Sequence, residues 1–219
     1  MIQVIGAGLA GCEAAWQIAQ AGEEVELFEM KPARYSPAHK SPLFAELICS
    51  NSLKAARIES AAGLLKEEMR RLGSLLTECA ASCAVPAGGA LAVDREEFSS
   101  LVTKRIREHP RIHVHEGEEI RELPREGIAI VATGPLTSDA LAEQIQALCG
   151  GGLSFFDAAA PIVTADSLDM SQVFCASRYD KGGDDAYLNC PMDKPAYEAF
   201  REALVEAERA PVHDFDVRD

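Results

Sequence analysis

The sequence lacks any long hydrophobic run. None of its apolar stretches continues without interruption for about 18 residues, the length that a membrane-spanning helix needs. The opening segment MIQVIGAGLAGCEAAWQIAQ is apolar, but it has no basic residues ahead of its apolar core, which a signal peptide would have. Both absences argue against a membrane-bound or exported protein. We expect a cytoplasmic globular protein, because 47% of the 219 residues are apolar and can form a buried core.

The sequence also lacks the paired cysteine spacing of a disulfide-rich or zinc-binding domain. Its seven cysteines are odd in number and irregularly spaced, which predicts reduced thiols. Cys79 and Cys83 are four residues apart, so on a helix they would share a face that suits a metal or a redox pair. No nearby CxxC motif or histidine completes a set of four ligands, which favours two buried small residues. We therefore expect no metal site.

Positive charge is scarce. The chain has 21 basic and 35 acidic residues, a formal net charge of −14 that argues against a polyanionic partner. The basic residues nevertheless gather in two clusters. These are Lys54, Arg57, Lys66, Arg70 and Arg71, and then Lys104, Arg105, Arg107 and Arg111. A local basic face and ordinary solvated helix surfaces both explain these clusters, and the sequence leaves both open.

The first thirty residues do contain a dinucleotide-binding pattern. A short β-prone run at residues 2–5 leads directly into the glycine turn GAGLAG, which is followed by a helix-like segment from Cys12 to Ala21. An alternating strand over residues 24–29 then ends on Glu29. This order of strand, glycine turn, helix, strand and acid is the one that a Rossmann-like fold requires.

Each part of this pattern has a physical task. Gly6 allows the tight turn, Gly8 lets the backbone approach a pyrophosphate, and Gly11 lets the helix pack on the strand. The helix N-terminus then offers free N–H groups to the phosphates. Glu29 follows Gly11 by 18 residues, close to the ~20 expected for the carboxylate that binds a ribose hydroxyl. Cys12 lies just inside the helix, and we assign it to packing.

The rest of the sequence predicts further elements of an α/β fold. Residues 55–78 form one or two helices, whose periodic apolar side chains we assign to the core. Asp94 is predicted to cap the next helix, and strands are predicted at residues 112–115 and 127–133. Gly134 ends the last strand. An apolar strand that ends in Ala-Thr-Gly is common in flavoproteins, where the glycine lets the backbone pass close to the cofactor.

Ten segments give the chain a resemblance to a known family. They run in family order from residue 2 to residue 192: GAGLAGCEAAW, LFEMKP, SPAH, FAELICSNSL, GLLKEEMRRLGSL, VPAGGALAVDREEF, ATGPLTS, FDAAAPIV, RYDKGG and YLNCPM. The first and seventh are general to flavoproteins, whereas FAELICSNSL, PAGGALAVDR and YLNCPM are much more specific. On these segments the chain resembles the bacterial folate- and FAD-dependent tRNA uracil-5-methyltransferases, the TrmFO family.

The resemblance implies a flavoenzyme that methylates carbon 5 of the T-loop uracil in tRNA. Its cofactor would be FAD, with methylenetetrahydrofolate and NAD(P)H as cosubstrates and the T-arm of tRNA as partner. The resemblance implies a Rossmann-like FAD-binding fold with FAD, not NAD, at the GAGLAG turn. Glu29 would bind the adenosine ribose, with Lys31 near it. The residues expected to bind the cofactor are Gly6, Gly8, Gly11, Glu29, Lys31 and Gly134.

The same resemblance gives a role to the cysteine in FAELICSNSL. Addition of a thiolate at carbon 6 of uracil would make carbon 5 nucleophilic, so the reaction needs an accessible and partly ionised thiol. Cys49 is the candidate catalytic residue, and the donors of Ser50, Asn51 and Ser52 would favour its thiolate. Whether Cys49 attacks the base or acts on the flavin adduct is left open. The alternative is a cysteine that only packs.

Other residues in these segments are further candidates. His39 is either a proton-transfer group or a bystander in its loop. Cys190 is assigned a structural role, because the proline after it suggests a tight turn. The candidate contacts to RNA or folate are Arg178, Tyr179 and Lys181.

The chain departs from the family in length. Family members are much longer, and their remaining part supplies a second catalytic cysteine and the segment that completes the FAD fold. We therefore expect an incomplete FAD-binding domain at residues 1–150 and part of an inserted α/β domain at residues 151–219. This chain alone is expected to be inactive. Two other functions stay open, a flavin oxidoreductase that acts on a small molecule and a non-catalytic dinucleotide-binding module.

Overall fold

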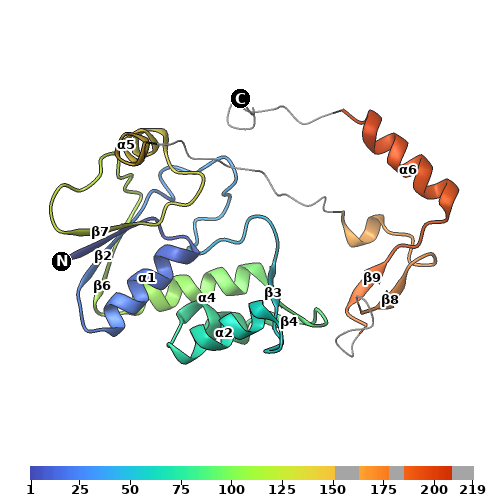
Figure 1. Cartoon of the computed structure of the whole chain (residues 1–219), viewed down its shortest axis with the longest axis horizontal. Coiled ribbons are helices and arrows are strands. Elements are labelled where there is room, and N and C mark those ends of the chain that lie inside the picture. The colour runs from blue at the N-terminus through green and yellow to red at the C-terminus, as the bar shows by residue number, and fades with distance from the viewer. Residues whose placement is uncertain (151–162, 178–184, 209–219) are drawn as a thin grey trace. The chain divides into compact units, whose positions relative to one another are not determined.

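The computed structural model describes residues 1–150, 163–177 and 185–208 (Figure 1). The chain separates into two compact units. The first contains Met1–Val85 and Ala90–Ser154, and the second contains Pro86–Gly89 and Phe155–Asp219. Within the three described ranges, no helix has both the length and the apolar character needed to cross a membrane.

The first unit is built on a four-stranded parallel sheet. Its strands lie in the order β6-β2-β1-β7, and all three neighbouring pairs are parallel. The strands are β1 (Ile2–Ile5), β2 (Val25–Glu29), β6 (Ile112–Glu116) and β7 (Ile128–Val131). The sheet confirms the predicted α/β fold, and each strand lies within two residues of its predicted bounds.

The inner strands are buried against helix α1 (Leu9–Gln20). Val4 on β1 and Leu27 on β2 have no exposed surface. The face that α1 turns to them carries small buried residues, among them Cys12 and Ala15. Small side chains let the helix approach the sheet closely, so the glycine turn between β1 and α1 is held firmly in place.

Strand β7 lies at the edge of this sheet and is covered less well. It pairs with β1 on one side. All four of its residues are exposed, and Ile128 is 64% exposed, although the sequence IAIV is apolar. Strands of a parallel sheet are usually covered on both faces. Helix α5 (Asp139–Cys149) follows β7 in the chain and buries Leu141.

A second sheet in the first unit was not predicted from the sequence. It is antiparallel, with the strand order β3-β5-β4. The strands are β3 (Ser52–Ala55), β4 (Ala84–Val85) and β5 (Ala90–Val93). Strands of two to four residues are too short to show an alternating pattern. The sheet anchors the chain directly after Cys49.

The helical segment predicted over residues 55–78 is two helices, α2 (Ala61–Arg71) and α3 (Leu75–Ser82). They are separated at Gly73, whose φ of 77° is a left-handed conformation that favours glycine. The hydroxyl of Ser74 then accepts a hydrogen bond from the Thr77 N–H, which starts α3.

Asp94 is the N-cap of helix α4 (Arg95–Glu108), as predicted. The Asp94 carboxylate accepts hydrogen bonds from the backbone N–H groups of Glu96 and Glu97, at 3.0 and 2.9 Å. Phe98 on this helix has no exposed surface and belongs to the core.

The prediction that α2 contributes apolar side chains to the core is wrong. Leu64 and Leu65 are 47% and 56% exposed, and Leu72, just past the helix, is 76% exposed. Of the eleven residues of α2, all of which the structure describes, Gly63 alone is buried. Hydrophobic periodicity identifies an amphipathic helix, but it does not say what covers the apolar face.

In its described residues, 86–89, 163–177 and 185–208, the second unit has one antiparallel strand pair and one longer helix. Its elements are η1 (Ala165–Ser167), β8 (Phe174–Ala176), β9 (Tyr187–Asn189) and α6 (Lys194–Glu206). Asp193 caps α6 by accepting a hydrogen bond from the Ala196 N–H at 2.8 Å. The candidate contacts Arg178, Tyr179 and Lys181 lie outside the described residues.

Candidate functional site

Two glycines of the turn between β1 and α1 have no room for a side chain. Gly6 has a φ of 98°, and a Cβ there would lie 2.8 Å from the carbonyl oxygen of Ala132. A Cβ on Gly11 would lie 1.7 Å from the carbonyl oxygen of Gly6. These contacts match the tasks expected of the two glycines, a tight turn and close packing of helix on strand.

Gly8 differs from its neighbours in the turn. A Cβ at this position would meet nothing within 4 Å, so the backbone here faces open space. Gly8 is also the N-cap of α1, and no side chain caps the helix. The first N–H groups of α1 and the positive end of its dipole therefore suit an anion such as a pyrophosphate.

Glu29 ends β2 beside this turn. The residue is 6% exposed, and its carboxylate accepts hydrogen bonds from the backbone N–H of Ala7 at 2.9 Å and of Lys31 at 3.0 Å. Gly134 comes shortly after the end of β7, with a φ of 70° and open space where a Cβ would be. Because parallel strands end at the same edge, the turn, Glu29 and Gly134 all follow the carboxyl edge of the sheet.

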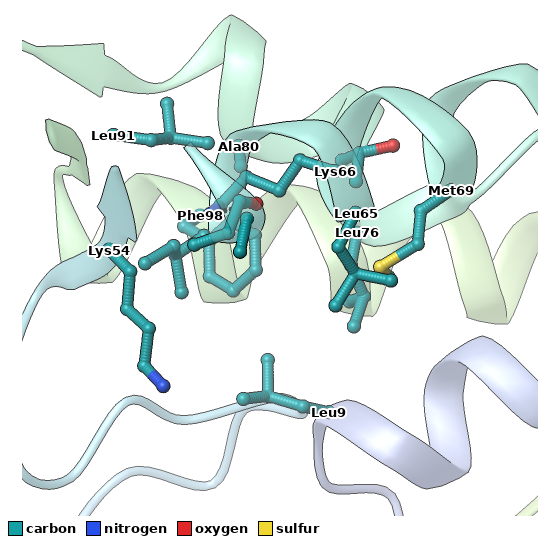
Figure 2. A pocket seen from close by; sticks show the side chains of 13 residues that line it. Leu9, Lys54, Leu65, Lys66, Met69, Leu76, Ala80, Leu91 and Phe98 are labelled. Carbon is teal, nitrogen blue, oxygen red and sulfur yellow. Dashed lines mark hydrogen bonds between the residues drawn. The ribbon is translucent and has the colours of Figure 1, made fainter. Parts of the chain in front are cut away.

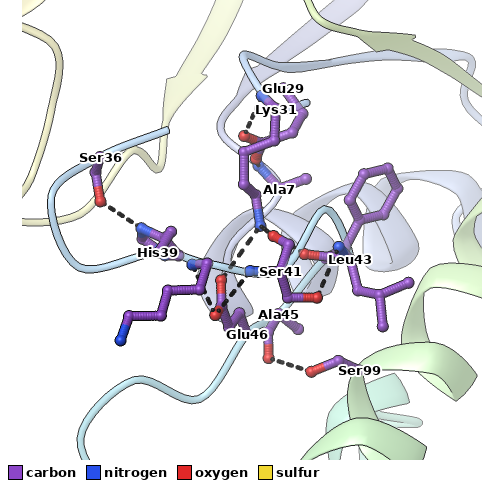
Figure 3. A network of polar contacts seen from close by, with 12 residues as sticks. Ala7, Glu29, Lys31, Ser36, His39, Ser41, Leu43, Ala45, Glu46 and Ser99 are labelled. Atoms are coloured by element: carbon purple, nitrogen blue, oxygen red, sulfur yellow. Dashed lines mark hydrogen bonds and ion pairs between the residues drawn. The ribbon is translucent and has the colours of Figure 1, made fainter. Parts of the chain in front are cut away.

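The side chain of Lys31 turns away from this edge into the loop that follows (Figure 3). Its amine donates hydrogen bonds to the carbonyl oxygens of Leu43 at 2.5 Å and Ser41 at 3.2 Å. Glu46 lies 3.8 Å from the same amine. Only the main chain of Lys31 contacts the Glu29 carboxylate.

His39 lies in the same loop. Its Nδ1 is 2.6 Å from the Ser36 hydroxyl. Burial, and then the charge of Lys31, lower the pKa of His39 below its usual value. A neutral imidazole bonded to a serine can accept a proton, but the contacts of His39 lie within its own loop.

The loop is joined to the glycine turn and to α4. The backbone N–H of Ala45 donates to the Ala7 carbonyl oxygen at 2.9 Å. The N–H of Phe44 donates to the Thr103 hydroxyl at 2.8 Å, and the Ser99 hydroxyl donates to the Ala45 carbonyl oxygen at 3.4 Å. The chain leading to Cys49 is thus fixed to the turn that begins α1.

Cys49 itself is exposed, between this loop and β3. The polar side chains after it bond to main-chain groups. The Asn51 side-chain amide donates to the Val93 carbonyl oxygen at 3.1 Å, and the Ser50 hydroxyl accepts from the Ser52 N–H at 3.0 Å. These contacts fix the backbone on the C-terminal side of Cys49. The residues after Cys49 therefore help to position its thiol.

Three other cysteines are poor candidates for a reactive thiol. Cys12, Cys79 and Cys83 are buried. Burial raises the pKa of the Cys12 and Cys83 thiols and raises that of Cys79 to about 11. The remaining exposed cysteines are Cys149, Cys175 and Cys190. Across the described part of the chain, no cluster of three or more His, Cys, Asp or Glu side chains could hold a metal ion.

The first unit also has an apolar pocket that was not predicted from the sequence. Residues of α1, α2 and α3 contribute to its lining (Figure 2). Its volume is about 500 Å³. Leu9, in the first turn of α1, lies across it from the side chains of α2 and α3. The lining residues are Leu9, Leu53, Lys54, Ala61, Ala62, Leu65, Lys66, Met69, Leu76, Thr77, Ala80, Leu91 and Phe98. In the sequence, the signal for this pocket was the periodic spacing of the apolar residues in α2.

A family model and several known proteins match the chain. The family model described as glucose inhibited division protein A matches residues 1–219. Two proteins named methylenetetrahydrofolate--tRNA-(uracil-5-)-methyltransferase TrmFO, from Acetivibrio thermocellus and Desulfitobacterium hafniense, are each 60% identical to it over 216 residues. These alignments cover 98% of this chain and 49% of each relative. The chain therefore spans about half the length of the curated relatives it matches.

Solved structures also align with the chain. Aquifex aeolicus GidA in its form II crystal aligns at a TM-score of 0.45 and 16% identity, over 57% of this chain and 21% of that one. The relatives at 60% identity confirm the resemblance to the TrmFO family that the sequence segments indicated. Together with the match over all 219 residues, they show that the chain belongs to the glucose inhibited division protein A family.

Proposed function

We propose that this chain is part of an FAD-dependent enzyme that methylates carbon 5 of the T-loop uracil in tRNA. Methylenetetrahydrofolate would supply the one-carbon unit and NAD(P)H the reducing equivalents. The names of the relatives support the reaction, and the glycine turn supports a dinucleotide cofactor. Because the chain spans about half of those relatives, we assign the reaction to the whole protein and expect no turnover from this chain alone.

One observation carries the proposal. The hydrogen bond from the Ala45 N–H to the Ala7 carbonyl oxygen, 2.9 Å long, joins the segment leading to Cys49 to the glycine turn. A reaction that uses both a thiol and a dinucleotide needs the two held in a fixed relation. The antiparallel sheet after Cys49 anchors the other side of the thiol segment through Asn51 and Val93.

The residues at the carboxyl edge of the sheet fit FAD. Gly6 and Gly11 shape the turn, and the open backbone at Gly8 would receive the pyrophosphate. The Glu29 carboxylate would accept a hydrogen bond from the adenosine ribose, and Gly134 would let the chain after β7 pass close to the cofactor. Reduced FAD, when bound, supplies the electrons that convert a methylene unit to a methyl group.

The apolar pocket is the proposed place for the flat ring system of the cofactor. Leu9 belongs both to the first turn of α1 and to the wall of the pocket, so the pocket adjoins the turn that would hold the phosphates. Its lining is almost entirely apolar, which suits an aromatic ring. The lining includes Lys54, which follows Cys49 by five residues and so brings the thiol segment to the same pocket.

Cys49 is the proposed nucleophile. Its thiolate would add to carbon 6 of the uracil, and carbon 5 would then attack the one-carbon unit. Loss of the proton from carbon 5 and departure of the thiolate restore the ring. Exposure of Cys49 agrees with this role, because a tRNA base must reach the sulfur. Methylation of tRNA would take place in the cytoplasm.

The two parts of the chain have different proposed tasks. Residues 1–150 would form the FAD-binding domain, with the closing segment supplied by the rest of the protein. Residues 151–219 would begin an inserted domain. Binding of the tRNA T-arm is assigned to the whole protein, since the net charge of this chain is −14.

The reaction is tested with tRNA tritiated at carbon 5 of uracil and a protein of full family length that contains this sequence. Tritium release that depends on methylenetetrahydrofolate is expected, together with the absorption spectrum of a bound flavin. A tRNA whose T-loop uracil is already methylated serves as control and should release no tritium from that position. A flavin-containing protein that releases no tritium under any of these conditions would contradict the proposal.

A second function is favoured by one observation, the strongly negative charge. A flavin oxidoreductase acting on a small molecule needs no polyanionic partner, and a charge of −14 repels tRNA. Flavin reduction by NAD(P)H with rapid oxidation by a small electron acceptor, and without any dependence on tRNA, would support it. A protein that shows no flavin spectrum would instead be a non-catalytic dinucleotide-binding module.

A further inference from the structure

Lys31 is a buried amine that the proposed reaction does not use. It is 4% exposed and lies two residues after Glu29. Its ammonium group donates to the carbonyl oxygens of Ser41 and Leu43, at 3.2 and 2.5 Å (Figure 3). A buried ammonium needs such acceptors and a counter-charge nearby.

Glu46 supplies that counter-charge from the same loop. One carboxylate oxygen of Glu46 accepts from the backbone N–H groups of Lys40 and Ser41, both at 3.1 Å. The other oxygen is buried, has no hydrogen-bond partner among the described residues, and lies 3.8 Å from the Lys31 amine. This oxygen therefore depends on the positive charge of Lys31, because an unpaired buried carboxylate is strongly unfavourable.

Together the two side chains close the loop on itself. Lys31 holds Ser41 and Leu43, and Glu46 holds Lys40 and Ser41. The closed loop presents the Ala45 N–H to the glycine turn, although Ala45 has a φ of 51°, which is unusual for a residue with a side chain. An unfavourable backbone conformation persists where the surrounding contacts fix it.

We propose that Lys31 and Glu46 form an ionic clamp that positions the Cys49 segment for methyl transfer. Lys31 is thus a positioning residue whose side chain acts through the loop, while its main-chain N–H contacts the Glu29 carboxylate. Cys49 follows Glu46 by three residues, so the clamp fixes one side of the thiol segment and the Asn51 contact to Val93 fixes the other. The role in methyl transfer rests on the proposed function, whereas the clamp itself does not.

The clamp is tested by hydrogen exchange in the protein of full family length. The amides of Lys40, Ser41, Phe44 and Ala45 are hydrogen-bonded and should exchange slowly. Lys31→Met should speed exchange in a peptide spanning residues 40–46 by at least about tenfold. Lys40→Met, which alters an exposed lysine of the same loop, is the matched control and should leave the exchange unchanged. Unchanged exchange in Lys31→Met would overturn the clamp whether or not the protein methylates tRNA.

Flavin content separates a positioning role from a role at the ribose. Lys31→Met should retain bound flavin and keep the KM for tRNA within about twofold, while kcat falls by about tenfold or more. Loss of flavin with normal loop exchange would overturn the proposal and place the Lys31 side chain at the ribose.

A double variant separates positioning from stability. Lys31→Met combined with Glu46→Leu removes both charges, so no buried carboxylate remains unpaired and the melting temperature should recover towards that of the wild type. The loop should still exchange rapidly and kcat should stay low, because the bonds to Ser41 and Leu43 are still absent. Recovery of kcat together with the melting temperature would show a merely structural role and overturn the positioning role.

Discussion

The carboxylate of Glu29 accepts a hydrogen bond of 2.9 Å from the backbone N–H of Ala7, 22 residues earlier in the chain. This bond ties the end of β2 to the glycine turn that begins α1. The acid expected to bind a ribose is therefore also a structural link between the two halves of the dinucleotide pattern.

Glu29→Ala should reduce flavin retention, because both the proposed ribose acceptor and the link to Ala7 are lost. We expect flavin affinity to fall by at least tenfold and the protein to lose about 1–3 kcal/mol of stability, as for an unpaired buried N–H. Flavin absorbance per mole of protein and urea unfolding measure the two effects. Glu29→Gln is the control, since an amide oxygen can still accept from Ala7. Full flavin content in Glu29→Ala would show that Glu29 does not contribute to flavin binding.

Two glycines of the turn should respond differently to the same substitution. Gly11→Ala forces a Cβ to within 1.7 Å of the Gly6 carbonyl oxygen, so we expect a loss of about 3 kcal/mol or more. Gly8→Ala meets no atom within 4 Å and should fold normally, but its methyl group would enter the space proposed for the pyrophosphate. Thermal melting and flavin content of both variants test the difference. Normal flavin content in Gly8→Ala would contradict the proposed place of the phosphates.

Cys49→Ala should abolish methyl transfer in the protein of full family length while flavin content stays normal, because Cys49 belongs neither to the glycine turn nor to the proposed ribose site at Glu29. Cys12→Ala is the matched control. It removes a buried thiol, so it should cost about 1 kcal/mol of stability and leave turnover within a few-fold of the wild type. Tritium release and melting temperature should be measured on the same samples. Wild-type turnover in Cys49→Ala would mean that this thiol is not the nucleophile.

The apolar pocket can be tested with two neighbouring leucines of α2. Leu65 lines the pocket and Leu64 does not, although both are about half exposed. Leu65→Trp should fill part of the pocket and weaken flavin binding by about tenfold, with little change in stability because the site is partly open. Leu64→Trp should leave binding unchanged. Equal flavin affinity in the two variants would rule out the pocket as the place of the ring.

Alkaline pH should destabilise the first unit through Cys79. Burial raises the pKa of this thiol from 9.0 to about 11, so between these values the unfolded chain has lost the proton that the folded chain keeps. The contribution of the Cys79 thiol to the free energy of unfolding is complete below pH 9 and is lost as the pH rises to about 11. Urea unfolding of the wild type and of Cys79→Ala across this range measures it, and the variant should lose less stability. If the free energy of unfolding falls equally with pH in both proteins, the raised pKa of Cys79 is contradicted.

The sequence allowed the parallel sheet and the glycine turn to be predicted because their determinants are local. Gly6, Gly11 and Glu29 lie within one short pattern. Steric contacts require the two glycines, and Glu29 accepts a hydrogen bond from the turn between them. The Lys31 side chain could not be placed in this way. Its partners lie 10 and 12 residues further on in an irregular loop, where no periodicity indicates which atoms will meet.

The apolar residues of α2 show a different limit. Their spacing predicted a helix correctly, but Leu65 lines a pocket and is not buried in the core. The antiparallel sheet escaped prediction because β4 has two residues and β3 is irregular in its pairing with β5. Short strands are specified by their partners, which lie elsewhere in the chain.

The pairing of β1 with β7 has a consequence for how the chain folds. Ile2 lies beside Val25 on one side and beside Ile128 on the other, so one neighbour is close in the chain and the other is distant. Closing a long loop costs more entropy than closing a short one, and non-local pairs form late. During synthesis, β1 and β2 can pair around α1 long before Ile128 leaves the ribosome. We expect β7 to join the sheet last and, in hydrogen exchange of the folded protein, to open first.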